Sequence, residues 1–271
     1  MSSGIQVFLD TYFNIKEIKP RNTEYMSSRV RDLTSALLLS MVIIGGEFFA
    51  RRVGAVILPT IFDYGFMDLL CLGAIYLIIC PAVYLLQRGG VRQKACYTGF
   101  SLKNIVQRNT LFTAIIIIVL GIQVVNRLDL LLFSGINYNP AFISSLENHL
   151  GKPVYVNAPM YPEYSKIATS IIFILVNGLW VPVAEEFLWR GVIQTKLSYH
   201  TSPWVAITVT SILFSVKHAV VDLVLTRLLF LFVFGLAVGW AKQRTNTWIS
   251  TLSHGYINLT GTIYWIIGKI L

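Results

Sequence analysis

The chain contains repeated apolar runs, and these runs limit its fold more than any other feature of the sequence. A run of ~20 apolar residues is long enough to cross the hydrocarbon core of a bilayer as an α-helix. We place seven candidate spans near residues 33–50, 66–86, 110–133, 165–184, 203–221, 226–241 and 247–268. Only 13% of the 271 residues are charged, whereas a soluble domain usually has about 25%. The sequence therefore predicts an all-α, polytopic transmembrane bundle of about seven to eight membrane helices, the eighth being a partly embedded helix from Glu185 to Leu197.

The first 32 residues are more polar than the rest of the chain. Residues 1–32 are polar and of mixed charge, and they lack the apolar core and small-residue cleavage site of a secretory signal. We predict that they form a cytosolic N-terminal segment, whose start (residues 4–13) fits either an interfacial amphipathic helix or a loosely packed tail. No long polar linker interrupts residues 33–271, which we interpret as a single transmembrane bundle.

Basic residues predict the orientation of this bundle, because cytoplasmic loops of membrane proteins are enriched in Lys and Arg. The segment 87–109 has no acidic residue and contains Arg88, Arg92, Lys94, Lys103 and Arg108. Placing it in the cytoplasm also places the N-terminus there, although Arg51 and Arg52 then fall on the opposite side. The same topology accounts for the net charge of +9, so we expect membrane lipids around the chain and no nucleic-acid partner.

Ionisable side chains occur where a membrane should exclude them. The stretch VPVAEEFLWRGVIQ follows the apolar run IATSIIFILVNGLW and contains Glu185, Glu186 and Arg190. A charged group at a bilayer centre costs at least ~2.5–3.5 kcal/mol, so it rarely occurs there without a purpose. Glu186 and Arg190 are four residues apart on a predicted helix, which favours an ion pair on one face. Glu185 is rotated by ~100°, and this predicts that it remains free for partners from other helices.

Two more polar pairs follow in apolar surroundings. Phe214 and His218 lie four residues apart in ILFSVKHAV, and His254 and Asn258 have the same spacing in ISTLSHGYINLTG. Each pair therefore shares a helix face. Taken alone, each cluster is more often a salt bridge or a packing contact. Together, a general base, two imidazoles and a carboxamide can orient a water, hold a metal or stabilise an oxyanion, which is what amide hydrolysis requires.

Three other charged residues receive a structural interpretation. Lys217 is expected to extend toward the membrane interface, as buried Lys residues usually do. The alternative is that it disfavours protonation of its neighbour His218 by like-charge repulsion. Glu47 and Arg51 have i,i+4 spacing and are interpreted as an ion pair at the membrane boundary rather than as functional residues.

The order of the three motifs resembles one protein family. E-E-x-x-x-R, F-x-x-x-H and H-x-x-x-N on successive membrane helices are similar to the CAAX-protease and bacteriocin-processing (Abi) family of intramembrane endopeptidases, over roughly residues 165–260. The resemblance implies a catalytic core in this region, with a pocket inside the membrane that opens toward the cytosolic leaflet. It also implies roles for six residues: water activation by Glu185 and His218, oxyanion stabilisation by His254 and Asn258, and support from Glu186 and Arg190.

The resemblance leaves the cofactor and the substrate open. Glu185, His218 and His254 are plausible ligands of a zinc ion that keeps one position for water, but the same residues serve a metal-free mechanism. The implied substrate is a membrane-associated protein or peptide, either prenylated and of the CAAX type or a peptide precursor. Since no eukaryotic targeting signal is evident, we expect a prokaryotic plasma membrane protein.

Two other functions compete with an endopeptidase. Buried Glu and His residues also form the proton relays of transporters, but the chain has no paired halves with interrupted helices, as transporters often have. A catalytically silent immunity or scaffold protein is the other alternative, and the presence of every motif residue argues against it.

Overall fold

The computed structural model of the chain describes residues 22–57, 64–87, 97–100, 163–221 and 228–270, and their regular structure is entirely helical. The all-α prediction is confirmed for these residues. The predicted span 110–133 and the N-terminal residues 4–13 lie outside them. The helices are α2 (Asn22–Ile57), α3 (Tyr64–Leu86), α7 (Glu163–Phe173), η2 (Ile174–Trp180), α8 (Val181–Glu185), η3 (Glu186–Gln194), α9 (Thr195–Ser198), α10 (Pro203–Val221), α11 (Leu228–Arg244) and α12 (Thr247–Ile270).

The helix that carries the two adjacent glutamates is continuous from Glu163 to Ser198, since α7, η2, α8, η3 and α9 follow one another without a gap. The prediction of a separate element from Glu185 to Leu197 is therefore wrong. Two stretches of this run, η2 and η3, are π-helical. The first of them directly precedes the α8 turn that contains Pro182, whose ring would clash with a carbonyl of the preceding turn in a regular α-helix. The wider π turn changes this spacing and lets the chain continue past the proline.

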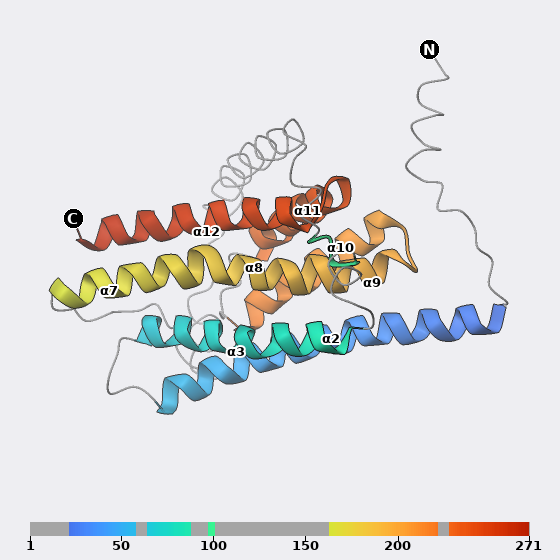
Figure 1. Cartoon of the computed structure of the whole chain (residues 1–271), viewed down its shortest axis with the longest axis horizontal. Coiled ribbons are helices and arrows are strands. Elements are labelled where there is room, and N and C mark those ends of the chain that lie inside the picture. Colours follow the sequence, from blue (N-terminus) through green and yellow to red (C-terminus); the bar gives the residue numbers. More distant parts are fainter. Residues whose placement is uncertain (1–21, 58–63, 88–96, 101–162, 222–227, 271) are drawn as a thin grey trace, which may run out of the picture.

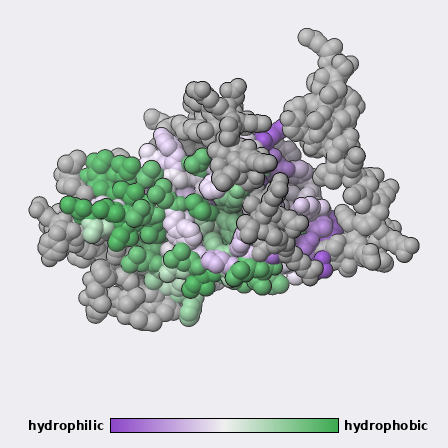
Figure 2. Space-filling view, viewed as in Figure 1, coloured by the Kyte–Doolittle hydropathy of each residue, from purple (hydrophilic) through white to green (hydrophobic). Residues whose placement is uncertain are grey.

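Four helical segments are long and apolar enough to cross a membrane: Arg29–Arg52, Leu69–Leu86, Ser170–Ser198 and Pro203–Val221. Of the other long helices, α11 has only 17 residues, and α12 contains buried polar residues such as Ser250 and His254. The predicted number of seven to eight membrane helices is thus not confirmed by the part of the chain that the structure describes. Large hydrophobic side chains are exposed along α2, α3, α7 and α12. Figure 2 shows hydrophobic residues gathered over the left end of the molecule, where α7, α12 and α3 lie in Figure 1, and hydrophilic residues toward α9.

The run from α7 to α9 lies between α12 and the pair α2–α3 (Figure 1). Behind it, α10 and α11 approach each other closely at Gly235, where an added Cβ would lie 2.9 Å from the Cβ and 3.1 Å from the Cα of Ser211. Small residues permit such an approach between membrane helices. Gln194 of η3 donates a hydrogen bond to the Gly239 carbonyl of α11 at 3.0 Å. These contacts fix α10 and α11 against the helix that carries the glutamates.

The contact at Gly235 predicts a stability effect. We expect Gly235→Ala to lower the free energy of unfolding by about 1–3 kcal/mol, because the added methyl group overlaps the backbone of α10. The matched control is Gly261→Ala in α12, where a Cβ would meet nothing within 4 Å; this change should leave stability unchanged or raise it by up to about 1 kcal/mol through helix propensity. Thermal unfolding of the detergent-solubilised variants measures both, and equal midpoints would contradict the proposed close approach.

Candidate active site

A cavity of about 180 Å³ lies between the continuous helix and its neighbours. Its wall contains four of the six candidate site residues, Glu185, His218, His254 and Asn258, and also the motif residue Phe214. They come from α8, α10 and α12, which are separated by intervening helices or loops in the sequence. The structure therefore brings the three motifs together around one cavity.

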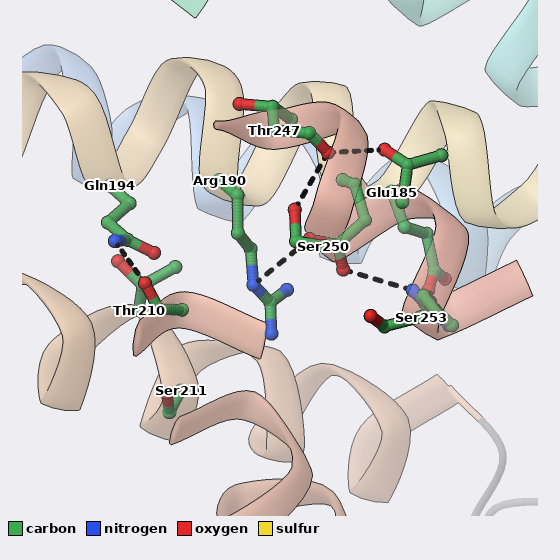
Figure 3. A network of polar contacts seen from close by, with 12 residues as sticks. Glu185, Arg190, Gln194, Thr210, Ser211, Thr247, Ser250 and Ser253 are labelled. Carbon is green, nitrogen blue, oxygen red and sulfur yellow. Dashed lines mark hydrogen bonds and ion pairs between the residues drawn. The ribbon is translucent and has the colours of Figure 1, made fainter. Parts of the chain in front are cut away.

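Glu186 and Arg190 lie beside this cavity and not in its wall. Arg190 Nε is 3.5 Å from Glu186 Oε2, and both side chains are fully buried, so the ion pair predicted from their spacing is present. It is an ion pair without a hydrogen bond, because the guanidinium nitrogens have no hydrogen-bond partner among the residues that the structure describes. The guanidinium instead lies 4.4 Å over the ring of Phe214, a cation–π contact. Figure 3 shows Arg190 and Gln194 projecting from η3 in the same direction, near Ser250 of α12 and Thr210 of α10.

His254 connects the two adjacent carboxylates. Its Nδ1 is 3.0 Å from Glu186 Oε1, and its Nε2 is 3.6 Å from Glu185 Oε2. The rings of Phe214 and Phe234 pack edge-on against the imidazole, with centroid distances of 6.1 and 5.0 Å. Glu186 thus orients the imidazole through one nitrogen, and the other nitrogen faces Glu185. This contact assigns Glu186 a role that the spacing of residues within its own helix did not reveal.

His218 and Asn258 complete the polar part of the wall. The His218 ring lies 4.8 Å from the Phe214 ring in an edge-to-face arrangement, so Phe214 packs against both imidazoles of the cavity. Asn258 donates from Nδ2 to the carbonyl of Asn177 at 3.1 Å and thereby joins α12 to the π-helical η2. The Asn258 side chain thus connects two helices and also presents its carboxamide to the cavity.

The prediction for Lys217 is wrong. Its side chain is fully buried and does not extend to an interface. Its ammonium nitrogen lies 2.6 Å from Glu185 Oε1 and 3.2 Å from Glu47 Oε2. Attraction to two carboxylates retains the ammonium in the interior, where solvation by water is lost. Glu185 is thus held by a cation from α10, in agreement with the prediction that it would be within reach of partners from other helices.

The ion pair of Glu47 and Arg51 that their spacing predicted is present, with Arg51 Nη1 3.6 Å from Glu47 Oε1. The two side chains are only 1% and 6% exposed, and both line the cavity, so the pair belongs to the site. Tyr76 belongs to none of the sequence motifs, yet its hydroxyl is 2.9 Å from Glu47 Oε2 and 3.0 Å from Glu185 Oε1. The only signal in the sequence was one acidic residue and one tyrosine within long apolar runs.

The donor atoms around the cavity do not fit a zinc ion in this arrangement. In the part of the chain that the structure describes, no three His, Cys, Asp or Glu side chains are grouped as a metal site requires. Moreover, Glu185 Oε1 is in contact with the ammonium of Lys217 at 2.6 Å. A divalent cation on the same carboxylate would be repelled by this positive charge at short range.

Comparison with known proteins identifies the C-terminal part of the chain. Residues 167–260 match the family model described as Rce1-like, type II CAAX prenyl endopeptidase. The resemblance that the motifs indicated is thus confirmed over this region, which contains all six residues selected from the sequence. Neither the curated proteins nor the solved structures include a match to the chain. Glu47 and Tyr76 lie outside the matched region, whereas Lys217 lies within it.

The buried pair of Glu186 and Arg190 predicts an effect on stability. We expect Glu186→Gln to lower the free energy of unfolding by about 3–5 kcal/mol, because it leaves a buried guanidinium without a counter-charge. The matched double variant Glu186→Gln/Arg190→Met removes both charges and should recover most of this loss. Thermal unfolding in detergent measures the difference. If the single and double variants were equally destabilised, the ion pair would not be the cause.

Proposed function

We propose that this chain, whose residues 167–260 form an Rce1-like domain, is an intramembrane endopeptidase that hydrolyses a peptide bond of a membrane-associated substrate. The observation that carries the proposal is the shared cavity, which is lined by Glu185, His218, His254 and Asn258 from three separate helices. A carboxylate, two imidazoles and a carboxamide at one place can activate water and stabilise an oxyanion. Polar groups inside a membrane cost free energy, and peptide hydrolysis gives each of these four groups a function.

In the proposed reaction, Glu185 accepts a proton from a water molecule that His218 orients, and the water oxygen attacks the carbonyl carbon of the scissile bond. His254 and Asn258 donate hydrogen bonds to the oxyanion that develops on the carbonyl oxygen. When the intermediate collapses, the carbon–nitrogen bond breaks and the proton held by Glu185 passes to the leaving amine. Glu186 and Arg190 do not contact the substrate; Glu186 holds the imidazole of His254 in place.

The cavity also supports an apolar substrate. Beside the polar groups, its wall contains Phe230, Leu231 and Phe234 of α11 and Ile257 of α12. Such a wall suits a lipid chain or an apolar peptide, in agreement with a prenylated CAAX-type substrate or a hydrophobic peptide precursor. A prokaryotic plasma membrane and a cytoplasmic N-terminus remain predictions from the sequence.

Zinc is not needed in this proposal. Because the ammonium of Lys217 contacts Glu185, we propose that the carboxylate acts as a general base and not as a metal ligand. The geometry favours this alternative of the two that the sequence left open, and it makes the reaction independent of chelators.

Peptide cleavage by the purified protein tests the proposed activity. We expect the wild-type protein in liposomes to cut at least one member of a panel of prenylated and unprenylated peptides. Glu185→Gln and His218→Ala should each lower kcat/KM by at least about 10²-fold, which is the size of a general acid–base contribution. Mass spectrometry of the products gives the bond that is cut.

Matched controls come from a second His and acidic pair in the same chain. His200 and Asp32 are in contact at 2.9 Å but do not line the cavity. His200→Ala and Asp32→Asn should retain cleavage within about threefold, since neither residue has a part in the proposed chemistry. Cleavage that survives Glu185→Gln would exclude Glu185 as the base.

The metal-free proposal has its own test. We expect prolonged dialysis against a strong chelator to leave kcat/KM unchanged, and elemental analysis of the active protein to give far less than one zinc per chain. Loss of activity on chelation, with recovery on addition of zinc and not of magnesium, would refute the proposal and restore the zinc alternative.

A further inference from the structure

We propose that Lys217, Tyr76 and Glu47 are positioning residues that hold one oxygen of Glu185, so that the other oxygen is the one that accepts the proton. The inference rests on the proposed function, because it concerns the base of that reaction. It extends the active site to α2 and α3, which lie outside the matched region.

The two oxygens of Glu185 have different surroundings. Oε1 accepts a charge-assisted hydrogen bond from Lys217 Nζ at 2.6 Å, and it shares the single proton of the Tyr76 hydroxyl, at 3.0 Å, with Glu47 Oε2 at 2.9 Å. Oε2 faces His254 Nε2 at 3.6 Å. A carboxylate oxygen that already accepts a charge-assisted hydrogen bond and shares the proton of a hydroxyl is a poor proton acceptor compared with its neighbour. The geometry therefore assigns the role of base to Oε2.

Lys217 and Tyr76 contact the Glu185 carboxylate but do not themselves line the cavity. Both are fully buried, and Glu185 itself lines the cavity. A substrate in the cavity would thus touch Glu185 but not the two groups that hold it. This placement fits residues that fix the rotamer of the base and do not take part in bond making.

Glu47 stabilises both donors. Its carboxylate lies 3.2 Å from Lys217 Nζ and 2.9 Å from the Tyr76 hydroxyl, so the three residues form a closed set of contacts with Glu185. Arg51, 3.6 Å from Glu47, supplies a second cation. Two carboxylates are then balanced by two cations, as a buried polar cluster requires.

A single lost hydroxyl provides the most conservative test. Tyr76→Phe should lower kcat by about tenfold, the rate equivalent of one hydrogen bond to a charged group, and leave KM unchanged, because the substrate does not contact Tyr76. The control is Tyr256→Phe, at a side chain of α12 that is 54% exposed, which should retain both constants.

A second pair of variants separates positioning from mere charge balance. Lys217→Met should lower the unfolding midpoint, because it leaves two carboxylates close together in the interior. Glu47→Gln/Lys217→Met restores the balance of charge and should regain the midpoint, but its kcat should remain at least tenfold below the wild-type value. A double variant that regained both would show that Lys217 acts only on stability.

The inference is overturned if Tyr76→Phe retains the wild-type kcat, or if the double variant recovers full activity. A wild-type protein that cuts no peptide would refute the proposed function instead. In that case, the contact between Glu185 and Lys217 is tested by the unfolding midpoints of Glu185→Gln, Lys217→Met and the double variant. We expect non-additive midpoint changes for residues in contact, and additive changes would overturn the positioning contact.

Discussion

The structure depends on the placement of an ammonium group between two carboxylates in the interior of a membrane bundle. Lys217 contacts Glu185 at 2.6 Å and Glu47 at 3.2 Å, and none of the three is appreciably exposed. Each of these charges alone would be costly to bury, but together they neutralise one another. Because the three residues belong to α2, α8 and α10, their mutual attraction also sets the arrangement of these helices around the cavity.

The continuous helix from Glu163 to Ser198 gives this arrangement its geometry. Consecutive residues on a helix point in different directions, which lets Glu185 face Lys217 and Tyr76 while Glu186 faces Arg190. The carboxylates nevertheless meet again at His254, which contacts Glu185 through Nε2 and Glu186 through Nδ1. One imidazole from α12 thus unites two charge pairs that the helix separates. The π-helical stretches on both sides of α8 fit this demand, since such turns often occur at functional sites.

The sequence predicted what lies within one helix better than what lies opposite it. The pairing of Glu186 with Arg190 and the common face of Phe214 and His218 follow from i,i+4 spacing alone. The contact of Lys217 with Glu47 joins residues 170 positions apart, and no local pattern contains this information. An isolated Lys near the end of a span is expected at the interface, and only the approach of two carboxylates from other helices reverses that expectation. The number of membrane spans also depends on residues that the structure does not describe.

The same contacts serve stability and reactivity, and this explains why a catalytic carboxylate can be kept in an apolar bundle. Many active sites lower stability because they hold functional groups without sufficient partners. Here Lys217 and Tyr76 meet Glu185 on Oε1, so the charge is compensated while Oε2 remains directed toward His254. The Glu185 carboxylate is thus already oriented, and it does not have to rearrange when a substrate enters. The geometry of Glu185 is therefore a consequence of burying it, and its proposed reactivity follows from the one oxygen that burial leaves available.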